Sequence, residues 1–250
     1  MITKNEIKYF SSLRQKKHRQ EERKIIVEGN KLITEGIESG LKPEVIITTV
    51  PFHESEPDFF ESLKEFRIEK LKTPEFVKLT ETKNPQEVAA VFSIQSKEFS
   101  SKGIQSRVPV YLDQISDPGN VGTIIRTCDW FGVAELLLSE DSVELYNPKV
   151  VRSSMGSVFH MDIYEHIKIE HLEALKDKGY KIICSDIEGQ DVYGFTLPEK
   201  SILVFSNEAH GPDDKVLRLA DHIISIKKKG KAESLNVASA SAVILSLLAK

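Results

Sequence analysis

The chain contains only two cysteines, Cys128 and Cys184, among its 250 residues. Two cysteines supply no disulfide framework, and their spacing matches no metal site. Cys128 falls within an apolar helical pattern and Cys184 ends an apolar strand pattern, so we expect both to be buried, reduced thiols. We therefore expect a fold without disulfides and a functional site without a metal.

Long apolar runs are also missing from the sequence. No segment is apolar and long enough to cross a bilayer, and the first ten residues, MITKNEIKYF, lack the apolar core of a signal peptide. Apolar residues make up 40% of the chain and charged residues 29%, which is typical of a globular rather than a disordered protein. We expect a cytoplasmic protein without a membrane partner.

Four common catalytic or ligand-binding patterns are absent. The sequence has no GxGxxG, no Walker phosphate loop, no GxSxG and no HExxH. The usual fingerprints of dinucleotide binding, nucleotide hydrolysis, α/β-hydrolase catalysis and zinc catalysis are therefore missing.

The sequence also lacks a general excess of positive charge, because its net charge is −4. This value argues against a uniformly basic surface for nucleic acid, but local clusters can still bind phosphate. Residues 1–31 hold nine Lys or Arg against four Glu, and the densest cluster reads RQKKHR from Arg14 to Arg19. Such a cluster is either a solvated helix end or a surface that contacts a polyanion.

Apolar periodicity predicts two α/β units. In residues 1–95, strand patterns at 25–27, 45–49, 67–69 and 88–92 alternate with helical patterns. Residues 96–107, SKEFSSKGIQSR, lose this periodicity and predict a linker. Repeated strand and helix patterns in residues 108–250 predict a parallel sheet covered by helices on both faces, with strands at 108–115, 134–138, 158–164, 181–184, 201–205 and 220–226.

Polar, glycine-containing loops follow three strands of the second unit, at residues 117–122, 206–211 and 227–236. In open α/β sheets, ligands bind outside the carboxyl ends of the strands, so these loops could converge on one site. Gly119 and Gly122 in the first loop allow close approach of the backbone.

Single residues near these loops have more than one interpretation. Arg126 could form a surface salt bridge, but a cation near a helix start opposes the helix dipole and favours an anionic partner. Glu208 could be a general base, a cap or an exposed charge. Asn236 could simply cap the following helix. Residue chemistry alone therefore reaches a two-domain α/β protein whose site meets an anion.

Three segments, in order, resemble the motifs of the SpoU (TrmH-like) branch of the SPOUT RNA ribose methyltransferases. They read LDQISDPGNVGTIIRTCDWFG at 112–132, LVFSNEAHGP at 203–212 and ISIKKKGKAESLNVASASAVIL at 224–245. The intervening RSSMG at 152–156 is similar to the family's RxSxG segment. The resemblance covers residues 108–250.

This resemblance implies a fold, a cofactor and partners. The implied fold is a parallel-sheet SPOUT domain whose C-terminal segment makes a deep trefoil knot. The implied methyl donor is S-adenosylmethionine, and the implied assembly is a homodimer with the active site at or near the subunit interface. Residues 1–95 are similar to the α/β substrate-binding domain of members that act on ribosomal RNA. Ribosomal RNA is therefore preferred, with transfer RNA or a non-catalytic RNA-binding role as alternatives.

The resemblance also implies roles for residues that match the motifs. The implied catalytic set is Asn120, Arg126, Glu208 and Asn236. The implied donor-binding set is Ser206, Gly211, Ile226, Ser234 and Leu235. The implied RNA-binding set is Arg14, Lys17, Arg19, Arg126 and Arg152.

The sequence departs from the family pattern at a few positions. Ser206 and Ala209 stand where the second motif usually has glycines, and Ser225 stands where the third usually has proline. A residue at a glycine position costs strain if its φ is positive. The Lys-rich segment 227–231 is a candidate RNA contact or a cover over the donor.

Overall fold

The computed structural model describes residues 2–80, 82, 84–94, 97–207 and 211–248. The chain divides into two compact units, Met1–Gln95 and Ser96–Lys250. Within the described residues, none of the helices combines the length and apolar character needed to span a membrane.

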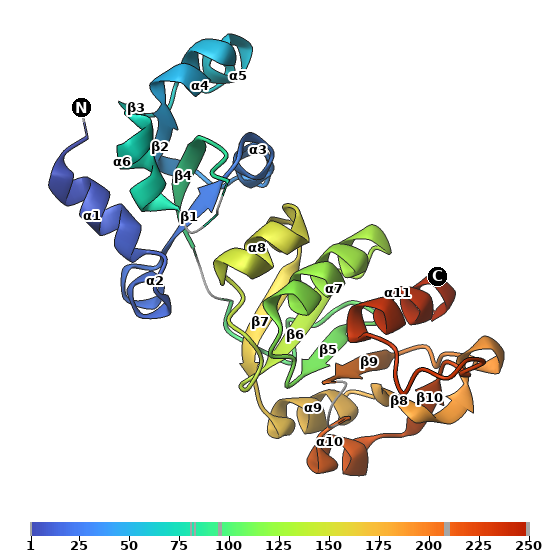
Figure 1. The fold of residues 1–250 in the computed structure, drawn as a ribbon. Helices are drawn as coiled ribbons and strands as arrows, with labels where there is room; N and C mark the ends of the chain where they lie inside the picture. The colour runs from blue at the N-terminus through green and yellow to red at the C-terminus, as the bar shows by residue number, and fades with distance from the viewer. Residues whose placement is uncertain (1, 81, 83, 95–96, 208–210, 249–250) are drawn as a thin grey trace. The chain divides into compact units, whose positions relative to one another are not determined.

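The first unit is built on a four-stranded mixed sheet. Its strand order is β1-β4-β2-β3, with β4 antiparallel to β1 and β2, and β2 parallel to β3. The strands are β1 (Lys24–Glu28), β2 (Pro43–Thr49), β3 (Ile68–Leu71) and β4 (Val88–Ser93). The helices are α1 (Lys4–Ser12), α2 (Lys16–Glu22), α3 (Asn30–Glu38), α4 (Val50–Ser55), α5 (Pro57–Ser62), α6 (Thr73–Phe76) and the 3₁₀ turn η1 (Val77–Leu79). The predicted small α/β unit is therefore present (Figure 1).

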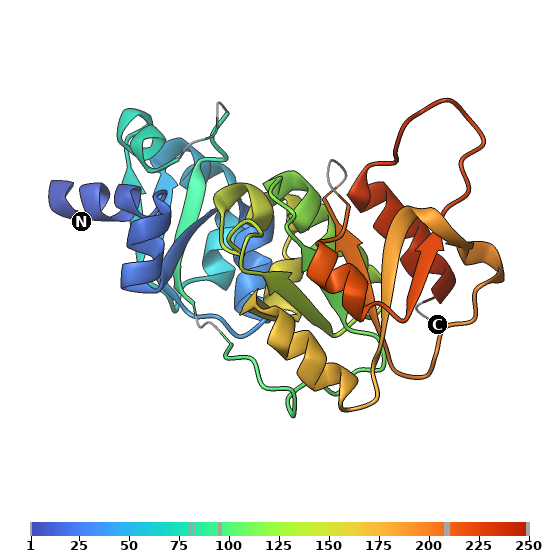
Figure 2. The same ribbon diagram turned by 90° about the horizontal axis from the view of Figure 1, so that it is seen from below.

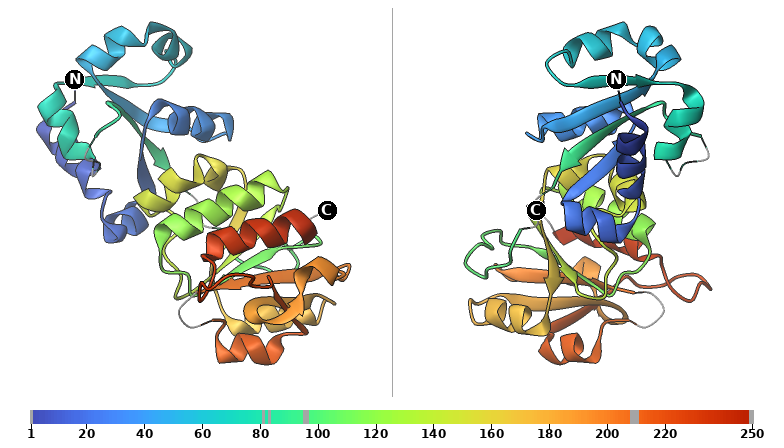
Figure 3. Two further views of the ribbon diagram at one scale, coloured as in Figure 1. Left: turned by 45° about the vertical axis from the view of Figure 1, so that its right-hand side comes forward. Right: turned by 90° about the vertical axis from the view of Figure 1, so that its left-hand side faces the viewer.

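The second unit is built on a six-stranded sheet of order β10-β8-β9-β5-β6-β7, in which every pair is parallel. Its strands are β5 (Val110–Asp113), β6 (Glu135–Ser139), β7 (Asp162–Ile167), β8 (Lys181–Asp191), β9 (Ser201–Ser206) and β10 (His222–Ser225). Its helices are α7 (Pro118–Trp130), α8 (Pro148–Ser154), α9 (Ile169–Lys176), α10 (Asp214–Leu219) and α11 (Val237–Leu248), with 3₁₀ turns η2 (Ser157–Phe159) and η3 (Val192–Gly194). Helices α7, α8 and α11 cover one face, and α9 and α10 cover the other (Figures 1 and 3). The predicted doubly covered parallel sheet is confirmed.

The burial of the central strands explains why this parallel sheet could be predicted from the sequence. Every residue of β5, β6 and β9 is buried, as expected for parallel strands covered on both faces. Cys128 and Cys184 are both buried, free thiols, as predicted. Burial raises the pKa of the Cys184 thiol to about 12, so it stays protonated at neutral pH.

Three segments differ from the expected pattern. Strand β7 begins at Asp162 because residues 157–159 form the turn η2. Strand β8 continues to Asp191, well beyond its apolar part. Part of the segment 96–107 packs on the second unit, because the backbone N–H groups of Gln105 and Ser106 donate to the Glu135 carboxylate at 2.9 and 3.0 Å.

Helices α7 and α8 approach each other closely at Gly122. A methyl carbon placed on Gly122 would lie 2.0 Å from Ser153 Oγ, 2.5 Å from the Val150 carbonyl oxygen and 2.9 Å from the Ser154 nitrogen. The first motif therefore needs glycine here so that α8 can pack against the helix that carries Asn120 and Arg126.

Candidate active site

The candidate site lies at the carboxyl ends of the strands of the second sheet. The first predicted loop follows β5 and the second follows β9, and these strands are neighbours. The third loop follows β10, which is separated from β9 by β8. All of these ends lie at the same edge of a parallel sheet, which is where ligands bind in open α/β folds.

A hydrogen bond joins the first and third loops. The side-chain Nδ2 of Asn236 donates to Oδ1 of Asn120 at 3.0 Å, although 116 residues separate the two positions. The structure therefore brings these two predicted site residues into direct contact.

Asn236 also caps helix α11. Its Oδ1 accepts hydrogen bonds from the backbone N–H groups of Ala238 at 3.0 Å and Ser239 at 3.3 Å. The two interpretations of this residue are therefore compatible, because the amide oxygen serves the helix while the amide nitrogen serves Asn120.

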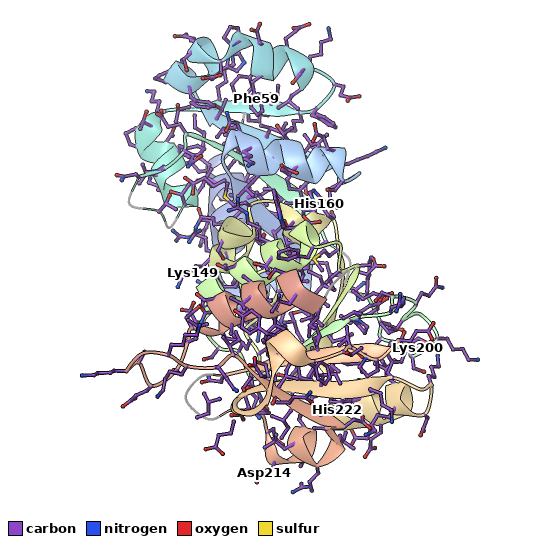
Figure 4. The ribbon with its side chains drawn as sticks, turned by 90° about the vertical axis from the view of Figure 1, so that its right-hand side faces the viewer. Phe59, Lys149, His160, Lys200, Asp214 and His222 are labelled. Atoms are coloured by element: carbon purple, nitrogen blue, oxygen red, sulfur yellow. The ribbon has the colours of Figure 1, made fainter. Side chains whose placement is uncertain are left out.

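Asn120 is held in place by the start of helix α7. Its backbone N–H donates to Oδ1 of the capping residue Asp117 at 2.9 Å. That hydrogen bond, together with an ion pair to Lys149 Nζ at 3.1 Å, lowers the pKa of the Asp117 carboxyl. Lys149 belongs to α8 and is labelled in Figure 4. The cap thus stays ionised and keeps the first loop fixed to both helices.

The first and second loops are joined by a second set of contacts. The buried Asp113 carboxylate accepts the backbone N–H of Asp213 at 2.7 Å. The side-chain amide of Gln114 donates to Asp213 Oδ2 at 3.1 Å, and the backbone carbonyl of Gln114 accepts from Asn207 Nδ2 at 3.4 Å. The last strand residue and the residue after it therefore hold both ends of the second loop, at Asn207 and Asp213. Glu208 and Ala209 lie between these ends, outside the described residues.

The contacts of Asp113 and Gln114 were not predicted from the sequence. Gln114 has a φ of +55°, a left-handed conformation that is uncommon for a residue with a side chain. Burial raises the pKa of the Asp113 carboxyl, and the Asp213 N–H counters that effect. A buried acidic residue at the end of an otherwise apolar strand was the available signal for this role.

Ser206 carries none of the strain considered for it. It is the buried last residue of β9 and pairs in register with Asp113, so its backbone is extended. Gly211 does have a positive φ, of +67°, and glycine suits that position. Ser225, which replaces the family's proline, donates from Oγ to the Gly189 carbonyl at 3.0 Å.

The third loop carries the remaining donor-binding candidates. Ile226 is half-buried directly after β10, whereas Ser234 and Leu235 are exposed. The Leu235 side chain is apolar, yet 48% of it is exposed. The Lys-rich segment 227–231 is exposed along its whole length, and Figure 2 shows this loop extending away from the sheet.

Arg126 lies on α7, but not near the start of the helix, where the sequence-based interpretation placed it. It is an exposed residue in the third turn of the helix Pro118–Trp130. The helix dipole acts within the first turn, so the dipole argument for an anionic partner was wrong. Arg126 follows Asn120 by six positions along the helix, a rise of about 9 Å.

The other basic residues predicted to bind RNA differ in how free their side chains are to contact a ligand. Arg19 is only 3% exposed, and its guanidinium donates to the carbonyls of Leu13 and Arg14, so it stabilises the turn between α1 and α2. Arg14 donates to the Thr80 carbonyl at 3.0 Å. Lys17 is exposed, and Arg152 is half-buried in the last turn of α8.

Comparison with known proteins places both units in families. The model of the SpoU rRNA Methylase family matches residues 107–246. The model of the MRM3-like substrate binding domain matches residues 4–90.

Individual relatives match over nearly the whole chain. The Bacillus subtilis 23S rRNA (guanosine(2553)-2′-O)-methyltransferase RlmP is 29% identical over 96% of this chain and 94% of its own. An AdoMet-bound rRNA methyltransferase structure from Sinorhizobium meliloti is 27% identical, with a TM-score of 0.83 over 98% of this chain and 94% of that one. The SpoU methyltransferase AviRb from Streptomyces viridochromogenes, in complex with AdoMet, is 25% identical, with a TM-score of 0.87 over 99% and 97% of the two chains.

The family model matches more than half of the chain and includes all three loops of the site. The protein therefore belongs to the SpoU rRNA methylase family.

Proposed function

We propose that this protein transfers a methyl group from S-adenosylmethionine to a ribose 2′-hydroxyl of ribosomal RNA. The observation that carries the proposal is the hydrogen bond between Asn120 and Asn236, which unites the first and third motifs of a SpoU-family chain. The choice of ribosomal RNA is supported by the substrate-binding domain matched at residues 4–90 and by the relative from Bacillus subtilis.

The residues at the strand ends fit the methyl donor. The half-buried Ile226 and the half-exposed Leu235 offer apolar surface, and Gly211 has no side chain to cover its backbone. These are the contacts that a nucleoside needs, since ligand sites combine apolar walls with a few backbone polar groups. Ser206 and Ser234 complete the proposed set. When bound, S-adenosylmethionine supplies a methyl group activated by its sulfonium charge.

The catalytic residues act on the ribose hydroxyl and its neighbouring phosphate. The hydroxyl has to lose its proton as it attacks, and Arg126 is a poor base because a guanidinium group holds its proton too tightly to accept another. Arg126 instead binds the adjacent phosphate and stabilises the developing negative charge, and the hydroxyl proton passes to the surrounding water. Asn120 and Asn236 orient the ribose, and we assign Glu208 to the same task.

Changing Asn236 to Asp separates its two roles. The carboxylate can still cap α11, so the free energy of unfolding should change by less than about 1 kcal/mol. The donor to Asn120 is replaced by an acceptor, so Asn120 has to turn its amide round to keep the hydrogen bond, and methyl transfer should fall about tenfold or more. Chemical denaturation and single-turnover assays measure the two effects, and equal activity of variant and wild type would contradict the role of the pair.

The RNA is proposed to contact basic residues of both units. Lys17, Arg126 and Arg152 remain candidates, whereas the internal contacts of Arg14 and Arg19 remove them from the proposed surface. Residues 1–95 would bind the substrate, 96–107 would link the units and 108–250 would catalyse the reaction. The Lys-rich segment 227–231 offers further cations, and Figure 4 shows long side chains projecting from this loop.

A trefoil knot in residues 108–250 is part of the same proposal. After the edge strand β10, the chain returns to α7, against which α11 packs. The Asn120–Asn236 hydrogen bond fixes that return path. The threading of the C-terminal segment is what the SpoU family match supports, and these contacts place α11 beside the first loop, where that segment would end.

We further propose that the protein is a homodimer. Trp130 at the end of α7 is 84% exposed, and the half-buried Ala240, Val243 and Leu247 share one face of α11. Exposed apolar surface of this kind marks an interaction site. Sedimentation equilibrium should give twice the 28.2 kDa chain mass for the wild type. The Trp130→Glu variant should give the single mass, and Val77→Glu in the first unit should leave the dimer intact; a monomeric wild type would refute the proposal.

Mapping of 2′-O-methyl groups tests the function. Ribosomal RNA from cells that lack the protein should lose one methylated ribose, and the purified protein should restore it with S-adenosylmethionine. Loss of a methylated ribose from transfer RNA instead would show that transfer RNA is the substrate. An unchanged methylation map would favour a non-catalytic RNA-binding protein. Fractionation should place the protein in the cytoplasm.

A further inference from the structure

The carboxyl end of β8 adds a fourth segment to the site. In the sheet, β8 lies between β9 and β10, the strands that lead into the second and third loops. The β8–β10 register jumps from Ile223 opposite Cys184 to Ile224 opposite Gln190, so residues 185–189 bulge out of the ladder. This bulge contains Asp186 and sits at the edge where ligands bind in such sheets.

The far end of the bulge is held by the last residue of β10, and the end of β8 lies beside the first residue of the third loop. Ser225 Oγ donates to the Gly189 carbonyl at 3.0 Å, and Lys227 Nζ lies 3.7 Å from Asp191 Oδ2. Its near end approaches the second loop, because a methyl carbon placed on Gly211 would lie 3.5 Å from Asp186 Oδ2. The bulge therefore bridges the two loops proposed to hold the donor.

The two carboxylate oxygens of Asp186 face different surroundings. Oδ1 accepts the backbone N–H groups of Ile187 at 2.5 Å and Glu188 at 3.4 Å, which shapes the turn. Oδ2 faces the backbone of Gly211, and Asp186 takes part in none of the ion pairs formed among the described residues. Oδ1 thus stabilises the turn, while Oδ2 is directed at Gly211, the glycine proposed to bind the donor.

We propose that Asp186 binds the ribose hydroxyls of the methyl donor through Oδ2. An ionised carboxylate only accepts hydrogen bonds, and the two vicinal hydroxyls of a nucleoside ribose are donors. An acidic residue near a strand end serves this purpose in dinucleotide-binding folds. The inference rests on the proposed function, because it requires S-adenosylmethionine to bind beside Gly211.

Calorimetric titration with two ligands, S-adenosylhomocysteine and 5′-methylthioadenosine, tests this role without an activity assay. Asp186→Asn keeps the oxygen that shapes the turn and replaces the ligand-facing oxygen with an NH₂ group. It should weaken both ligands about 10- to 100-fold, the effect of losing a hydrogen bond to a charged group. Glu188→Gln, on the exposed neighbouring residue, is the matched control and should bind both within about twofold of wild type.

The outcomes separate this inference from the proposed function. Equal weakening of both ligands supports the ribose contact, because 5′-methylthioadenosine keeps the ribose but lacks the amino-acid end. Weakening of S-adenosylhomocysteine alone would overturn it in favour of a contact to the ammonium group. Unchanged binding by Asp186→Asn would also overturn it while leaving the methyltransferase intact, whereas a wild type that binds neither ligand would overturn both proposals.

Discussion

Replacing Arg126 with alanine is expected to slow methyl transfer by a factor of about 10³ while donor affinity stays within about twofold. The reason is that different residues of the site are proposed to bind the RNA and the methyl donor. Arg126 is exposed on α7, whereas Ile226, Leu235 and Gly211, the residues proposed to hold the donor, belong to the segments after β9 and β10. Its guanidinium is proposed to meet only the RNA phosphate and the charge that develops during attack.

Two further variants test the chemistry of the guanidinium group and provide a control. Arg126→Lys keeps the charge but loses the planar, bidentate geometry, so it should recover only part of the rate. Arg218→Ala removes an exposed arginine from α10, on the opposite face of the sheet, and should leave the rate unchanged. Single-turnover assays measure the rate, and calorimetry with S-adenosylhomocysteine measures donor affinity. Normal turnover by Arg126→Ala would refute its assignment.

Replacing Gly122 with alanine should lower the free energy of unfolding by about 3 kcal/mol, at the upper end of the cost of overpacking. The new methyl group would meet Ser153 Oγ at 2.0 Å and the Val150 carbonyl oxygen at 2.5 Å. Ser153 cannot turn aside freely, because its hydroxyl donates to the Lys149 carbonyl at 2.7 Å. The backbone of α8 would have to move away from α7.

A double variant distinguishes the side-chain clash from the backbone clash. Adding Ser153→Ala removes only the hydroxyl contact, so it should restore less than half of the lost stability. Gly194→Ala is the matched control, because a methyl group there would have no neighbour within 4 Å, and it should change stability by less than about 0.5 kcal/mol. Urea denaturation measures all three, and a Gly122→Ala protein as stable as wild type would show that the helices separate without penalty.

The second sheet was predictable because its central strands are buried on both faces and therefore read as continuous apolar runs. The end of β8 was not, because residues 185–191 are mostly polar and none is fully buried, and among them only Gln190 and Asp191 pair with β10. Sequence periodicity reports burial, so a strand whose residues are exposed leaves no periodic signal.

The candidate site was predicted in part. Motif resemblance brought together Asn120 and Asn236, and their hydrogen bond confirms that these two positions meet. The role of Gln114 could not be predicted, since its left-handed conformation depends on Asp213 and Asn207 from a distant strand end. Arg19 was misread for a related reason, because a basic cluster does not reveal which of its members turn inward.

The hydrogen bond between Asn120 and Asn236 also bears on the order of folding. Contacts between residues 116 positions apart form late, because a long loop has to close before such a contact can stabilise it. Helix α11 is therefore expected to dock after the sheet has assembled, and donor affinity should appear only in that last phase. A ligand that binds the completed site then stabilises the native chain by an amount that grows with the logarithm of its concentration, so donor supply would shift the balance between folded and unfolded chain.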